Sequence, residues 1–168
     1  MKRVLFTSVA AMALSFTEIA TVKKTDDQFI VSAGSAGLFE VKLAELAQVN
    51  GASPAIRLLA EFMVKDHQKA NSELKALALK RGINLPAGLD EKQQKHYQKL
   101  FGKKGKAFDD AYAKFMVKDH KEAIGEFKNE AKNGIDPDVK SWASATLPLF
   151  EHHLQMSKET CKTIRYEK

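Results

Sequence analysis

The chain has 168 residues, of which 44% are hydrophobic and 29% are charged, and its formal net charge at pH 7 is +6. This length suits one globular domain with a substantial core, and the single cysteine, Cys161, excludes an internal disulfide. Only 4 prolines and 9 glycines interrupt a chain rich in alanine, leucine, lysine and glutamate, a composition that favours long helices over strands.

The N-terminal residues have the pattern of a signal peptide. Lys2 and Arg3 precede an apolar run over residues 4–16, which is too short to span a bilayer but typical of a signal-peptide core. We therefore expect a signal peptide at residues 1–20, with its cleavage point left open, and a single domain at residues 21–168. An uncleaved anchor is the alternative. The pattern predicts an exported protein of a bacterial periplasm.

The first two long helices are predicted from their ends and from apolar residues at spacings of three and four. Thr25 and Gln28 suit a capping box at the start of the first helix, and Asn50-Gly51 suits its end. Ser53-Pro54 then provides a cap and a first residue for the second helix, which ends near Lys80-Arg81-Gly82.

A long connection separates these two helices from two more. Residues 83–106 number about two dozen, far more than the 2–8 that usually join neighbouring helices, and they are long enough to run the length of a bundle. Within this connection, residues 90–101 are predicted to form a short polar helix. The third long helix begins near Ala107 and ends at Asn133-Gly134. The fourth begins at Asp136-Pro137 and contains Pro148, which is expected to kink it.

These elements predict an all-α fold, a ferritin-like four-helix bundle with a long crossover between the second and third long helices. Phe62 to His67 is repeated letter for letter as Phe115 to His120, so two of the helices carry a histidine near their middle. Glu40 and His153 interrupt the apolar stripes of the first and fourth helices at similar depth. Because helix midpoints lie at one level in a bundle, we expect Glu40, His67, His120 and His153 to meet.

One carboxylate and three imidazoles can supply a tetrahedral metal site. Zinc is the predicted ion, and copper, iron and manganese are the alternatives. Asp66 and Asp119 each precede one of the site histidines and point about 100° away from it on the same helix. Both are expected to reach a histidine on a partner helix and to support its ring as hydrogen-bond acceptors. His152 lies one residue off its stripe and is expected to face outward or to flank the site.

The same residues also have a simpler interpretation, in which Glu40 and the histidines form a hydrogen-bonded polar network without a metal. Met63, Met116 and Met156, on the apolar stripes, are interpreted as core residues rather than copper ligands. The crossover carries a basic run, which is interpreted as a solvated surface, with contact to the cell envelope as the alternative and no nucleic-acid partner expected. This run consists of Lys95, Lys99, Lys103, Lys104 and Lys106.

Several stretches of the sequence are recognisable together. They are Asp27-Gln28-Phe29, Gly37 to Val41, the two Met-Val-Lys-Asp-His stretches, Phe108 to Tyr112, and Leu147-Pro148 followed by His153-Leu154. In combination they resemble the family called domain of unknown function 4142, and the resemblance covers about residues 26–160. It implies an exported bacterial protein with a bundle similar to ferritin-like proteins, and it supplies no established activity.

Ferritin-like diiron proteins carry Glu-x-x-His on two of their helices. In this chain Val64, Val117 and Phe150 stand three positions before the site histidines, so an iron oxidase centre is disfavoured. Three hypotheses remain. The first is an exported metal-binding bundle, such as a metal buffer or an envelope stress protein. The second is a non-catalytic envelope interaction or structural protein, in which the buried Glu, His and Asp network only fixes helix register. The third, an enzyme that uses the central metal for redox or hydrolytic chemistry, is the least favoured, because it needs an open coordination position and an entry path that the sequence does not show.

Overall fold

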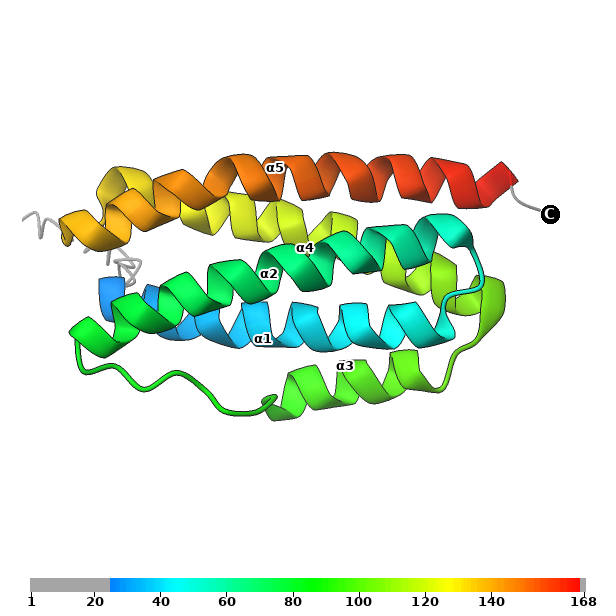
Figure 1. Cartoon of the computed structure of the whole chain (residues 1–168), viewed down its shortest axis with the longest axis horizontal. Coiled ribbons are helices and arrows are strands. Elements are labelled where there is room, and N and C mark those ends of the chain that lie inside the picture. The colour runs from blue at the N-terminus through cyan, green and yellow to red at the C-terminus, as the bar shows by residue number, and fades with distance from the viewer. Residues whose placement is uncertain (1–24, 167–168) are drawn as a thin grey trace, which may run out of the picture.

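The computed structural model describes residues 25–166, so the predicted signal peptide lies outside the described residues. This part of the chain forms five helices: α1 Asp26–Asn50, α2 Pro54–Lys80, α3 Glu91–Phe101, α4 Gly105–Asn133 and α5 Pro137–Tyr166. Four of the helices are long and run beside one another, and the short α3 lies along the outside (Figure 1). The predicted all-α fold, with four long helices and a short extra helix in the crossover, is confirmed. No helix within residues 25–166 is both long and apolar enough to cross a membrane.

Local sequence explains where the helices begin. The predicted capping box is present, because Gln28 N–H donates to Thr25 Oγ1 at 3.3 Å and Thr25 N–H donates to Gln28 Oε1 at 3.0 Å. α2 begins at the predicted Pro54, and Asp90 caps the short α3. α4 begins at Gly105, slightly earlier than the sequence predicts, with a φ of 56° that suits glycine.

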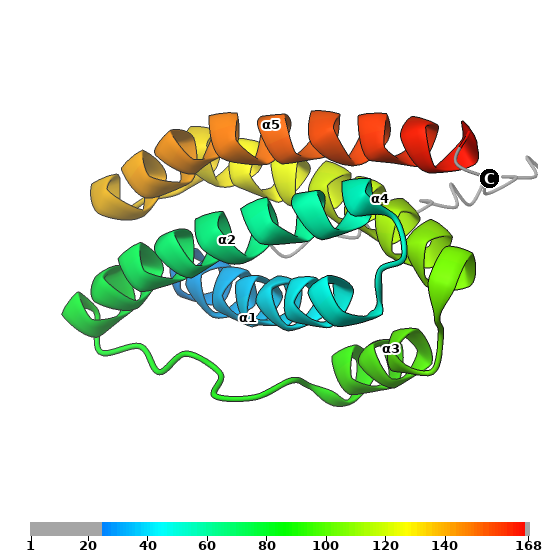
Figure 2. The ribbon, with the colours of Figure 1, turned by 45° about the vertical axis from the view of Figure 1, so that its right-hand side comes forward.

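The four long helices form two antiparallel hairpins, α1 with α2 and α4 with α5 (Figures 1 and 2). The segment between α2 and α4 runs back along the bundle, so α4 points in the same direction as α2 (Figure 1). α2 packs against α5 and α1 packs against α4, which closes the ring, while α3 contacts α1 and α4. α5 is one uninterrupted helix through Pro148.

Two carboxylates fix the register of the hairpins, because each binds the turn of the other hairpin. Asp109, which is 3% exposed, accepts hydrogen bonds from Ala52 N–H at 3.0 Å and from Ser53 N–H at 2.9 Å in the α1–α2 turn. Asp26 accepts from Ile135 N–H at 3.1 Å in the α4–α5 turn. Charge-assisted bonds to amides near helix starts hold each turn at the opposite hairpin. The midpoints of the four helices therefore lie at a common level.

The core consists of two hydrophobic clusters toward opposite ends of the bundle. One cluster contains Leu43, Leu59, Met63, Phe108 and Met116. The other contains Phe29, Leu74, Phe127, Val139 and Phe150. Along α2, α4 and α5 the residue that separates the two clusters is a buried histidine. A buried polar layer therefore divides the core, and this layer is the candidate site.

Candidate metal centre

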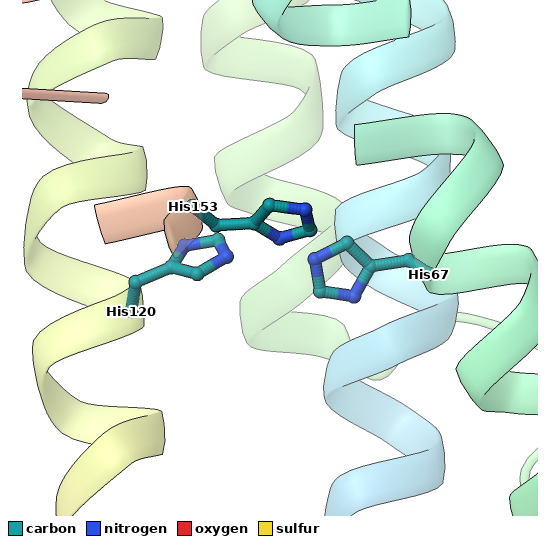
Figure 3. A group of neighbouring side chains, drawn as sticks. All are labelled: His67, His120 and His153. Carbon is teal, nitrogen blue, oxygen red and sulfur yellow. The ribbon is translucent and has the colours of Figure 1, made fainter. Parts of the chain in front are cut away.

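The three histidines that the sequence places at bundle mid-height lie together in the structure. His67 comes from α2, His120 from α4 and His153 from α5, and their rings point toward one another (Figure 3). Their ring centroids are 5.5 Å, 5.1 Å and 5.3 Å apart. One ring nitrogen from each histidine lies within 4.8 Å of those of the other two. Each histidine is 0% or 1% exposed, so solvent does not reach the rings directly.

One nitrogen of each ring has no hydrogen-bond partner within the described part of the chain. These atoms are His67 Nε2, His120 Nε2 and His153 Nδ1, and all three are buried. A buried polar atom left without a partner costs about 1–3 kcal/mol of folding free energy. A neutral imidazole nitrogen that carries no proton has a lone pair, which is the ligand that transition metals take from histidine.

The other nitrogen of each ring lies beside an oxygen. His67 Nδ1 is 3.1 Å from Glu40 Oε2, His120 Nδ1 is 3.0 Å from the Met116 carbonyl oxygen, and His153 Nε2 is 3.0 Å from Asp66 Oδ2. An oxygen at this position accepts the N–H of the ring, so the lone pair is left on the opposite nitrogen. Metal-binding histidines almost always have such an oxygen partner, which sets both the tautomer and the orientation of the ring.

Glu40 lies in the same layer, but beside the Nδ1 atoms of its neighbours. Its Oε1 is 3.6 Å from His120 Nδ1, in addition to the contact of Oε2 with His67. The sequence prediction made Glu40 the fourth ligand of a metal. The group of potential ligands found within residues 25–166 consists of the three histidines without Glu40. The Glu40 carboxyl group therefore lies where it can hold the imidazole rings in place. Metal binding by Glu40 and the three histidines stays a prediction.

Burial determines the charge of this layer. It raises the pKa of Glu40 well above the ordinary carboxyl range, and the nearby charge of Asp119 raises it further. Burial also lowers the pKa of His67 well below its usual value and lowers that of His120 to about 4. The pKa of His153 is lowered by burial too, although Asp66 opposes the shift. At neutral pH the three rings are therefore neutral, which is the form that binds a metal.

The two aspartates of the repeat have different partners. Asp66 reaches His153 across the α2–α5 interface, as the sequence predicts, and its side chain is 24% exposed. Asp119 lies beside the Glu40 carboxyl group and hydrogen-bonds with it, instead of reaching a ring nitrogen as predicted. The partners differ because the facing helices differ. Asp66 faces α5, which presents a histidine at this level, whereas Asp119 faces α1, which presents a glutamate.

Two aromatic residues near the site were not singled out as functional from the sequence. The Phe150 ring stacks on His67 with centroids 5.5 Å apart and contacts His120 edge-on at 5.8 Å. Its place one helical turn before His153 is the only sequence signal for this contact. The buried Tyr112 hydroxyl has no hydrogen-bond partner among residues 25–166, and burial together with the charge of Glu40 raises its pKa. His152 is exposed, as expected for a residue off the stripe.

The fold and this layer define a four-helix bundle with three buried histidines at its centre. The chain belongs to the family described as a domain of unknown function, DUF4142, which matches residues 11–160. A comparison with curated proteins finds no match.

Several solved structures are similar to this fold. A crystal structure of a DUF305 fragment from Deinococcus radiodurans is 11% identical, with a TM-score of 0.72, and the match covers 82% of this chain and 95% of that one. CopM in its Cu(I)-bound form is 18% identical, with a TM-score of 0.69, and the match covers 86% of this chain and 100% of that one. A DUF305 protein from Streptomyces coelicolor, 11% identical with a TM-score of 0.67, matches over 84% of this chain and 93% of its own. At these identities the likeness concerns the fold alone.

Proposed function

We propose that this protein binds one transition-metal ion at His67, His120 and His153, and that the ion is Cu(I). The observation that carries the proposal has two parts. Each of the three rings has a buried nitrogen without a hydrogen-bond partner among residues 25–166, and one nitrogen of each ring lies within 4.8 Å of those of the other two. A purely structural network would pair these atoms, because a buried polar group is stable when its hydrogen bonds are made. A bound cation would satisfy all three at once.

The donor set favours Cu(I) over zinc. The sequence prediction of zinc relied on four ligands, and Glu40 supports the imidazoles from their other side instead. Zinc bound by three imidazoles needs a fourth ligand, usually water. The histidines are at most 1% exposed, and the Phe150 ring stacks on His67 and contacts His120 edge-on, which disfavours a water ligand. Cu(I) accepts three nitrogen ligands, and a single positive charge costs less to bury than a double one.

The similar structures support this choice of metal. CopM, which shares the fold, has structures in Cu(I)-bound, Cu(II)-bound and silver-bound forms. Silver(I) and Cu(I) are both soft monovalent ions, so one site chemistry accommodates them. Iron and manganese are less suited to an all-imidazole, carboxylate-free set of ligands.

A buried centre of this kind suits storage or buffering of the metal in the cell envelope. The proposal places the protein in the periplasm, which is supported by the apolar run at residues 4–16 and by the similar Streptomyces coelicolor protein that is described as secreted. Catalysis by the metal would need an open coordination position that a substrate could reach. The burial of all three rings favours a binding role instead.

An anaerobic titration with Cu(I), in competition with a chromophoric chelator, tests the proposal. The wild-type protein should bind one Cu(I) per chain, and the double variant His67→Leu/His120→Leu should bind none. His152→Leu, which removes an exposed histidine next to the site, is the matched control and should bind like wild type. A parallel titration with zinc decides between the two metals. Absence of binding by wild type, or equal binding by the double variant, would contradict the proposal.

A further inference from the structure

A second candidate site lies under α3, outside the histidine layer. A cavity of about 720 Å³ opens between α3, α1 and α4. We propose that it binds a small aromatic carboxylate, meaning an anion with a flat apolar body. This inference is independent of the metal and goes beyond the proposed function. Three features of the lining support it: aromatic walls, unpaired ammonium groups and a buried hydrogen-bonding atom without a partner.

The walls of the cavity are aromatic. Phe39 from α1, Phe115 from α4 and His96 from α3 all line it. The His96 and Phe115 rings lie 4.3 Å apart, and Phe39 contacts both rings edge-on at 5.8 Å and 5.7 Å. Rings from three helices thus provide a preformed apolar surface. Such a surface suits stacking and edge contacts with a flat ligand.

The rim of the cavity has an excess of positive charge. Of its five lysines, Lys95 and Lys118 form ion pairs, with Glu91 at 2.6 Å and with Glu122 at 3.7 Å. The remaining three, Lys92, Lys99 and Lys114, have no carboxylate within salt-bridge distance among residues 25–166. Ammonium groups around an apolar pocket attract an anion and hold its charged end at the opening.

The acidic residues of the lining have their own partners, and they are fewer than the lysines, so an excess of positive charge remains. Asp90 accepts a hydrogen bond from Gln93 N–H at 2.8 Å as the cap of α3. Asp119 hydrogen-bonds with the Glu40 carboxyl group. Glu122 is the partner of Lys118. The lysines without partners therefore determine which charge the cavity accepts.

His96 forms part of the cavity wall. Its Nε2 atom is buried and has no hydrogen-bond partner among residues 25–166, so a ligand in the cavity reaches this atom when the ring turns. Burial lowers the pKa of His96, and the charges of Lys99 and Lys118 lower it further, so these two ammonium groups lie close to a neutral ring. The Nε2–H tautomer donates a hydrogen bond to a carboxylate, and the same carboxylate lies within the field of the lysines.

Calorimetric titration with 2-naphthoate tests the proposal. One naphthoate should bind per chain, whereas its neutral analogue 2-naphthylmethanol and inorganic phosphate should bind far more weakly. The first lacks the charge and the second lacks the apolar body. The variant Lys99→Gln/Lys114→Gln should weaken naphthoate binding about tenfold, because each lost ionic contact contributes modestly at a partly exposed rim. His96→Phe keeps the aromatic wall and removes the donor, so it should also weaken binding.

The matched control is Lys65→Gln/Lys69→Gln, which removes two exposed lysines of α2 away from this cavity. It should bind naphthoate like wild type, and circular dichroism should show the same helix content for every variant. Three results would overturn the proposal: no binding of naphthoate at millimolar concentration, equal binding of the alcohol or of phosphate, or equal affinity in the rim and control variants. Cu(I) binding by the same proteins is measured separately, so failure of one site does not affect the other.

Discussion

Cu(I) should raise the melting temperature of the wild-type protein and leave that of His120→Leu unchanged. His120 is 0% exposed and lies at the centre of the layer. Without metal, the substitution removes a buried unpartnered nitrogen, which stabilises by about 1–3 kcal/mol, and loses one hydrogen bond to the Met116 carbonyl, which costs about 1 kcal/mol. These opposed effects leave the free energy of unfolding of the metal-free variant within about 2 kcal/mol of wild type.

With metal the two proteins should differ clearly. A ligand that binds only the folded state at about 100 times its Kd stabilises that state by about 2.7 kcal/mol. For a domain of this size, each 1 kcal/mol shifts the melting temperature by about 2–4 °C. The expected rise for wild type is therefore about 5–11 °C. The variant keeps at most two of the three imidazole ligands and should show no comparable rise.

Anaerobic scanning calorimetry with and without excess Cu(I) measures both effects. His152→Leu serves as the control, because it removes an exposed imidazole beside the site and should keep the full rise. Equal rises in wild type and His120→Leu would refute the reasoning. Severe destabilisation of the metal-free His120→Leu protein would also refute the reasoning. It would show that the histidines form a structural network and not a metal-binding layer.

Three further predictions concern the supports of the site and the register of the bundle. Asp66→Asn removes the anionic acceptor of the His153 ring and should weaken Cu(I) binding about 10–100-fold in a competition titration. Asp119→Asn, which touches no ring nitrogen, should weaken Cu(I) binding less. A larger loss of affinity in Asp119→Asn than in Asp66→Asn would contradict the assignment of Asp66 as the support of His153. Because burial lowers the pKa of all three rings, to about 4 for His120, protons compete with the metal only in acid, and dialysis should leave Cu(I) bound at pH 6 and release it as the pH falls toward 4. Release already above pH 6 would count against the buried site. Asp109→Ala leaves two turn amides unpaired and should lower the free energy of unfolding in urea by about 3 kcal/mol. The number of metal ions bound should not change. An unchanged denaturation midpoint would show that the two hydrogen bonds of Asp109 contribute little to stability.

The fold could be predicted because its determinants are local. The Thr25 capping box, the Ser53-Pro54 helix start and the length of residues 83–106 are each read from a few neighbouring positions. The common level of the three histidines follows from their central positions in helices of similar length. None of these inferences depends on the orientation of a side chain about its own bonds.

The roles of individual side chains depend on tertiary contacts that the sequence does not reveal. Glu40 has a plausible spacing for a ligand, but its oxygens lie against the Nδ1 atoms of neighbouring rings. Asp66 and Asp119 occupy identical positions in the repeat, yet the residue facing each one differs. His96 lies in a stretch whose composition predicts a solvated helix, but α3 packs onto the bundle and encloses its ring with those of Phe39 and Phe115.

Copper K-edge X-ray absorption of the Cu(I)-loaded protein tests the central claim most directly. The predicted spectrum shows a three-coordinate ion with imidazole nitrogens as its only neighbours, and the signal should be lost from the His67→Leu/His120→Leu variant. Sulfur neighbours, as Met63 and Met116 would provide one helical turn away, would contradict the three-histidine centre. A copper ion coordinated mainly by oxygen, or one that the double variant retains, would contradict it as well.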